Sequence, residues 1–224
     1  MTTQRGFTLI EMAIVLVILT FLIGGLAMPL AAQIQARRIA ETRQIMADAR
    51  DALIGYAMTH QETGRPYLPC PADNVNGVES TRDGAGDCSA DEGFLPWATL
   101  GTAHQDAWGN RLKYRVTKAF SNSNGFQIAS AGDLRVCNDS TCMSLIADSV
   151  PVVLVSYGPN GYGARNISGS TLAAPTSANE LENTDTDIEF VSRPPSKAGE
   201  FDDLVIWISD SLLRSRVCPA GGCP

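Results

Sequence analysis

A long charge-free segment near the N-terminus constrains this chain most strongly. Six polar or small residues come first, and no charged residue occurs from Met12 to Ala32. About 20 apolar residues in a helix are enough to cross the hydrocarbon core of a bilayer. The segment is longer than the apolar core of a secretory signal peptide. Arg5 before it and Arg37-Arg38 after it do not fix its orientation. We therefore expect a membrane-spanning helix.

Glu11 lies at the edge of this segment. A carboxylate that enters a membrane costs a few kcal/mol, so it is expected to have a partner there. A simple signal anchor would not explain this residue.

The residues from Arg5 to Glu11 (Arg-Gly-Phe-Thr-Leu-Ile-Glu) resemble the processing motif of type IV prepilins and type II secretion pseudopilins. The resemblance implies that a prepilin peptidase cuts after Gly6 and that the new N-terminal residue, Phe7, is N-methylated. It also implies that Glu11 pairs with the N-terminal amine of a neighbouring subunit in a filament.

The N-terminal helix is expected to continue beyond the apolar segment. Apolar residues recur at helical spacing at Ile39, Met46, Ala49, Leu53 and Ala57. Gly64 and Pro66 then stop the helix. We predict one helix over roughly residues 8–62, whose second half packs on a soluble domain.

The rest of the chain shows strand patterns. Leu112, Tyr114 and Val116 alternate with polar residues between Arg111 and Lys118, which is the period of a strand. Asp210 is a candidate cap for a short helix through Arg216. Further strands are predicted at Phe126–Ser130, Val152–Tyr157, Ile188–Val191 and Leu204–Ile208.

The expected fold is α+β, with the long helix laid on an antiparallel sheet, as in pilins. The predicted parts are a leader (1–6), a transmembrane or filament-core helix (7–33), a helix continuing onto the soluble domain (34–63) and an extracytoplasmic domain (64–224).

Six cysteines occur in three pairs that are local in sequence: Cys70 and Cys88, Cys137 and Cys142, Cys218 and Cys223. An even count with local pairs indicates disulfides in an oxidising compartment. Proximity favours these three pairings. A four-cysteine zinc site built from the last two pairs is the alternative.

Composition argues against two classes of function. The net charge of −7 disfavours nucleic acid as a partner for the bulk of the chain. His60 and His104 are the only histidines, and no nucleophile-elbow, zinc-protease or phosphate-loop motif occurs, so we do not expect an enzyme.

Trp97, Trp108 and Trp207 fit core packing better than an exposed aromatic platform that would bind a ligand.

Three further stretches resemble the major pseudopilin of type II secretion: residues 106–110, 154–161 and 202–207. The resemblance implies a structural calcium ion held near Asp202 and Asp203. Asn160 replaces an aspartate of that family's earlier loop. The segment between these regions is longer than in the family and carries further hard oxygen ligands at Glu180, Glu182, Asp185 and Asp187. These acids also fit a merely solvated loop.

The sequence therefore predicts a minor pilin or pseudopilin. Its expected partners are a prepilin peptidase, sister subunits and an inner-membrane assembly platform. Its expected location is the inner membrane with a periplasmic domain, followed by the filament, which is either a periplasmic pseudopilus or a cell-surface pilus. Two alternatives stay open: a tip-located adhesin or substrate-binding subunit, and a signal-anchored periplasmic enzyme. The sequence does not distinguish a pilus from a secretion or competence system.

Overall fold

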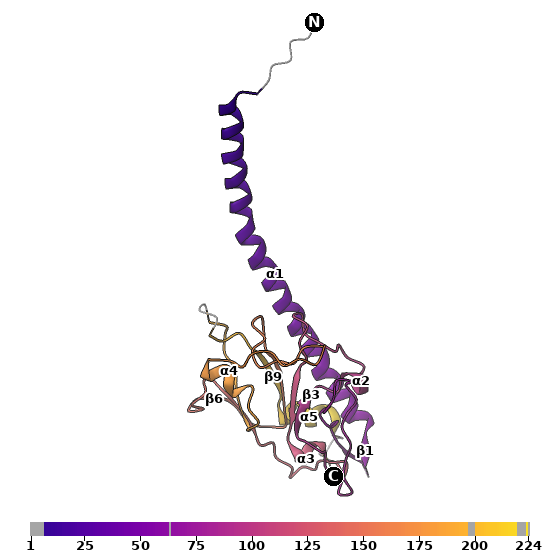
Figure 1. Ribbon diagram of the computed structural model, residues 1–224. Helices are drawn as coiled ribbons and strands as arrows, with labels where there is room; N and C mark the ends of the chain where they lie inside the picture. Colours follow the sequence, from indigo (N-terminus) through magenta and orange to yellow (C-terminus); the bar gives the residue numbers. More distant parts are fainter. Residues whose placement is uncertain (1–6, 63, 197–199, 219–222, 224) are drawn as a thin grey trace. The chain divides into compact units, whose positions relative to one another are not determined.

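The computed structural model describes residues 7–62, 64–196, 200–218 and 223, without the side chains of residues 23–29. The chain forms two compact units, residues 1–40 and 41–224. One helix, α1 (Leu9–Thr59), runs from the first unit into the second (Figure 1). Its start agrees with the prediction. It ends three residues earlier than predicted, because the chain turns at Gly64 (φ +81°) into a short hairpin of β1 (Gln61–Glu62) and β2 (Arg65–Pro66).

The two parts of α1 have different surroundings. In the second unit the predicted apolar stripe is confirmed, since Met46, Ala49, Leu53 and Ala57 are fully buried. In the first unit the described side chains from Phe7 to Leu22 are exposed. Within the described residues, no helix combines the length and the apolar character needed to cross a membrane, so the predicted span is not found in the structure.

Besides the β1–β2 hairpin, the described part of the second unit contains two larger sheets. The larger is antiparallel, in the order β3 (Glu92–Phe94), β4 (Lys113–Val116), β7 (Val152–Ser156) and β9 (Leu204–Ile208). Tyr114 faces Leu154, which in turn faces Ile206. The mixed α+β class and three of the predicted strands are thereby confirmed.

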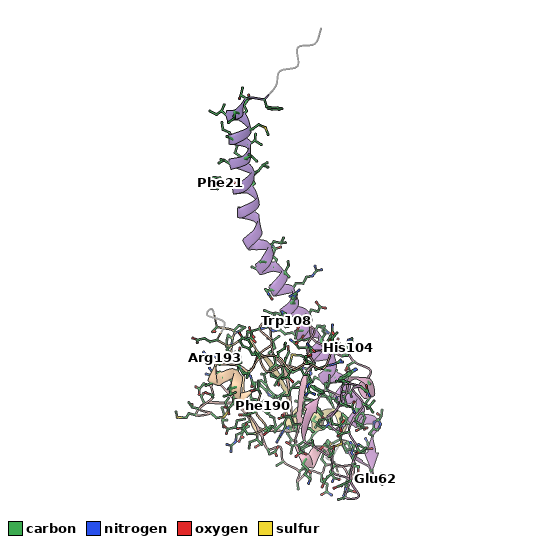
Figure 2. All side chains as sticks on the ribbon, viewed as in Figure 1. Phe21, Glu62, His104, Trp108, Phe190 and Arg193 are labelled. Atoms are coloured by element: carbon green, nitrogen blue, oxygen red, sulfur yellow. A yellow bond between two sulfur atoms is a disulfide. The ribbon has the colours of Figure 1, made fainter. Side chains whose placement is uncertain are left out.

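The smaller sheet has the order β6 (Leu145–Val150), β5 (Leu134–Cys137) and β8 (Glu189–Val191). The prediction of an antiparallel sheet is wrong for one pair here, since β5 and β8 run parallel, with Val136 beside Phe190. One hydrophobic cluster joins the two sheets. It contains Val136 and Phe190 from the smaller sheet and Val153, Val155 and Val205 from the larger. Figure 2 marks Phe190 within this region.

The described residues of this unit also form four short helices: α2 (Trp97–Leu100), α3 (Lys118–Ser121), α4 (Ala178–Glu182) and α5 (Asp210–Val217). The N-terminal cap of α5 is Ser209, whose Oγ accepts from the Leu212 N–H at 3.3 Å. Asp210, the predicted cap, is instead the first helical residue, and it pairs with Arg214 at 2.7 Å.

The strand predicted at Phe126–Ser130 is wrong. Phe126 lies in irregular chain, and its N–H donates to the Pro66 carbonyl at 2.9 Å. Its ring packs 4.7 Å from the Phe120 ring. Phe126 is thus a buried aromatic residue of a loop.

All six cysteines form disulfides, in the three pairs that proximity favoured: Cys70–Cys88, Cys137–Cys142 and Cys218–Cys223. The alternative zinc site would need four free thiolates, and the paired cysteines do not supply them.

Candidate functional site

The first candidate site is the N-terminal motif. The predicted cleavage residue, Gly6, lies outside the described residues. Phe7 is the first described residue, and its side chain is 81% exposed. Helix α1 begins two residues later, so the predicted cut would leave a free amine at the start of a helix.

Glu11 and Thr8 form a capping box at this helix start. The Thr8 N–H and the Thr8 hydroxyl both donate to Glu11 Oε2 at 2.8 Å, and the Glu11 N–H donates to Thr8 Oγ1 at 3.3 Å. Reciprocal bonds of this kind satisfy backbone N–H groups that have no partner within the helix. Within the single chain, the Glu11 carboxylate thus has a local partner that the sequence prediction did not include.

The surface of α1 after this cap is apolar. Exposed apolar side chains occupy nearly every position from Leu9 to Leu22, including Phe21, which is 78% exposed. Figure 2 shows Phe21 projecting from the helix. Because the apolar residues are consecutive, they surround the helix and do not form one stripe. A helix that is apolar all round is found buried in protein or lipid.

The second candidate site is an acidic cluster in the second unit. Glu180 comes from α4, and Asp202 and Asp203 come directly before β9. One carboxylate oxygen of each residue lies within 4.8 Å of the others. Glu180 and Asp203 are almost fully buried, at 2% and 3% exposed. The structure thus joins the two predicted calcium ligands to one acid of the long loop.

Hydrogen bonds satisfy only part of this cluster. Glu180 Oε1 accepts from the Asn160 side-chain amide at 2.9 Å and from the Asp202 N–H at 3.1 Å. Asp203 Oδ2 accepts from the Asn183 amide at 2.8 Å. The Oδ1 atoms of Asp202 and Asp203 have no hydrogen-bond partner among the described residues. Buried polar atoms nearly always have partners, so these two oxygens need one.

The electrostatics of the cluster are unfavourable without a cation. Burial raises the pKa of Asp202 to about 6, and the nearby Glu180 carboxylate adds to the shift. Burial also raises the pKa of Asp203 well above its usual range. A divalent ion with a preference for oxygen ligands would relieve both effects, and calcium takes carboxylate oxygens of this kind. The donor set therefore fits calcium in chemistry and charge.

The backbone supports the cluster through one glycine. Gly158 has φ +58°, and a Cβ there would collide with the Asp202 carbonyl. Because Gly158 has no side chain, the loop that carries Asn160 can approach the Asp202 backbone closely. The Asn160 N–H then donates to Asp202 Oδ2 at 3.2 Å. Asn160, which replaces a family aspartate, thus contributes hydrogen-bond donors to the cluster.

The other predicted loop acids form a separate group. Glu182, Asp185 and Asp187 approach one another at the surface, and the two aspartates are exposed. Among the described residues, no carboxylate oxygen of this group is both buried and without a hydrogen-bond partner. This group fits a solvated acidic loop.

His60, Trp97 and Trp207 take part in packing contacts, and Trp108 has a buried Nε1 without a hydrogen-bond partner among the described residues. The His60 ring stacks on Tyr56 with the ring centres 3.7 Å apart. The His104 carbonyl accepts from Arg111 at 2.6 Å. The Trp97 ring lies 4.0 Å from the Arg111 guanidinium, and Trp207 packs against the cluster between the sheets.

Comparison with known proteins gives one match. Residues 1–27 match the family model described as the prokaryotic N-terminal methylation motif, which is the type IV prepilin-type motif. Searches of the curated proteins and of the solved structures gave no match. The chain therefore carries a prepilin-type N-terminus.

Proposed function

We propose that this chain is a minor structural subunit of a type IV pilus-like or type II secretion pseudopilus filament. One observation carries the proposal. The residues that match the methylation motif include the first part of α1, which exposes apolar side chains all round from Leu9 to Leu22. Such a surface is stable only when lipid or other apolar helices cover it. A filament core of packed helices provides that cover.

The proposed route has two stages. The precursor sits in the inner membrane through the charge-free segment from Met12 to Ala32, with the second unit in the periplasm. A prepilin peptidase cuts after Gly6, and an inner-membrane assembly platform then moves the helix into a filament of sister subunits. The three disulfides support a periplasmic domain, because disulfides persist in oxidising compartments.

Glu11 is proposed to change partner during assembly. In the single chain its carboxylate accepts from the Thr8 N–H. In the filament it would face the amine of Phe7 in a neighbouring subunit. A charge that enters an apolar helix core is tolerable only when paired, so this contact would fix the stagger between adjacent helices.

The test is filament incorporation of the chain and of its Glu11→Gln variant. Glutamine still completes a capping box but carries no charge. We expect the wild-type chain in the filament fraction, sheared from the surface or released from the periplasm, of cells that have its assembly machinery. We expect Glu11→Gln to be processed normally but to be depleted from that fraction by about tenfold or more, the effect of losing a paired charge.

Glu41→Gln is the matched control, because it makes the same change at an exposed position of α1. It should assemble as the wild-type chain does. A wild-type chain that never enters filaments would contradict the proposed function. Normal assembly of Glu11→Gln would contradict the role of the charge.

We further propose that Glu180, Asp202 and Asp203 hold a structural calcium ion. The support is the pair of buried, unpartnered Oδ1 atoms, which lie in a cluster of three carboxylates. The ion would join α4 to the segment before β9 and so brace the long loop between them. It would have no part in a reaction.

A further inference from the structure

Three cations alternate along β4 and the residues just before it. Lys113 and Arg115 lie in β4, and Arg111 lies two residues before the strand. Because side chains alternate along extended chain, the three are expected on the same side. Arg111 is 7% exposed and Lys113 is 5% exposed. Buried cations are rare unless they are paired, and this chain has a net charge of −7.

Two of these cations are compensated. Glu92 Oε2 lies 3.2 Å from Lys113 Nζ and 3.4 Å from Arg115 Nη1. Lys113 Nζ also donates to the carbonyls of Asn183 at 3.1 Å and Asp185 at 2.6 Å. These contacts use all three donors of the ammonium group. Lys113 therefore has no capacity left for a ligand.

Arg111 is different. Its Nη1 donates to the His104 carbonyl at 2.6 Å and its Nη2 reaches the Val75 carbonyl at 3.5 Å. Its Nε has no acceptor, and it forms no ion pair with the described residues. Burial lowers the pKa of Arg111, yet an arginine stays charged in proteins. Within the described residues, Arg111 is thus a buried positive charge without a counter-ion, and its one aromatic contact is the Trp97 ring, whose centre lies 4.0 Å from the guanidinium.

A second uncompensated arginine lies beside it. The Arg111 N–H donates to the Arg165 carbonyl at 2.9 Å, which joins the two segments. The Arg165 side chain is exposed, and its guanidinium lies 5.7 Å from the centre of the Phe94 ring. Within the described part of the chain, Arg165 has no ion-pair partner.

Both arginines line one cavity of about 230 Å³. Glu92, Phe94, Lys113 and Tyr157 line it as well. The cavity is smaller than the roughly 300–1,000 Å³ of sites that take a whole drug-sized ligand. It has room for one small anion or one anionic group of a larger molecule, with the rings of Phe94 and Tyr157 as apolar walls.

We propose that this cavity binds an oxyanion group, a carboxylate or a phosphate, between Arg111 and Arg165. A guanidinium presents its N–H donors in a fork that matches either group. The anion would supply a counter-charge that neither arginine has among the described residues. This cavity shares no lining residue with the acidic cluster or with the N-terminal motif.

The test is calorimetric titration of the purified full chain, in non-ionic detergent, with inorganic phosphate and with acetate. Arg165→Gln is the informative variant, because Arg165 is exposed and its loss does not endanger folding. Arg216→Gln is the matched control: it removes the same charge from an exposed position of α5, away from the cavity. The buffer should contain enough chloride to screen long-range effects of net charge.

We expect saturable binding in the millimolar range or tighter. Arg165→Gln should weaken it about tenfold, the effect of losing one charged hydrogen bond, and Arg216→Gln should leave it unchanged. Tighter binding of phosphate would assign a phosphate ligand, and equal or tighter binding of acetate a carboxylate. The absence of saturable binding for both probes, or an equal loss in both variants, would overturn the proposal.

Discussion

Asp203 and Arg111 show the same physical problem with opposite sign. Each is an ionisable residue with less than a tenth of its surface exposed, and each has one polar atom without a partner among the described residues. Burying a charge costs several kcal/mol unless a counter-ion or a full set of hydrogen bonds offsets it. The two residues lie in separate clusters, one acidic and one basic. These two features are the support for the calcium ion and the oxyanion that we propose.

The acidic cluster gives a prediction for metal removal. Calcium at about 100 times its Kd should add about 2.7 kcal/mol to the free energy of unfolding. For a chain of this size that is a rise in Tm of roughly 5–10 °C, and a chelator should reverse it. Asp203→Asn should lose most of this rise, because it removes a buried ligand. Differential scanning calorimetry with and without chelator measures the effect.

The control for this experiment is Asp187→Asn, which changes an exposed acid of the separate loop group. It should keep the full response to calcium. The calcium proposal is wrong if the wild-type chain melts at the same temperature with calcium and with chelator. It is also wrong if Asp203→Asn responds as the wild-type chain does.

Local patterns predicted some site residues but not others. Phe7 and Glu11 belong to a contiguous motif, and Asp202-Asp203 lies in a short stretch with a family resemblance. The burial of the Arg111 charge could not be predicted from local patterns. Its guanidinium is held by the carbonyl of Val75, which is 36 residues away in the sequence, and by that of His104, which lies beyond a turn. The capping role of Thr8 could have been predicted, since Thr8 and Glu11 have the spacing of a capping box.

At the scale of elements, the periodicity of apolar residues in the sequence predicted those strands that have a buried face. β4 and β9 were predicted because their apolar residues lie against a core. β6 was missed because most of its side chains are exposed, so its sequence does not alternate. The parallel pairing of β5 with β8 joins segments about fifty residues apart, which no local pattern reveals.

The long irregular segment between β2 and β3 depends on a disulfide. Cys70 and Cys88 are 18 residues apart, and this link should contribute about 3 kcal/mol to the free energy of unfolding by restricting the unfolded chain. The double variant Cys70→Ala and Cys88→Ala should lose that amount. Urea denaturation of the oxidised chain measures it.

The pair Cys218–Cys223 is the comparison, because it closes a loop of only 5 residues. Its removal should cost about 2 kcal/mol, less than removal of the longer link. If the short link proves the more important of the two, restriction of the unfolded chain does not explain how the disulfides stabilise this domain.

At the scale of the whole molecule, the two units differ in whether their apolar side chains are buried. The second unit buries its own core between two sheets and braces its loops with disulfides. The first unit exposes apolar side chains along its described helix and is incomplete as an isolated structure. A prepilin-type motif stands directly at the start of that helix. Sister subunits would complete the helix as the core of a filament.

The mass of the mature chain tests this account most directly. The chain should be produced in cells with a prepilin peptidase and in matched cells without one, and its intact mass and N-terminal sequence determined. With the peptidase, we predict loss of residues 1–6 and a single added methyl group on Phe7. Without it, the full chain should persist. An uncleaved chain in both cells, or a cut near the end of the apolar segment, would contradict the account.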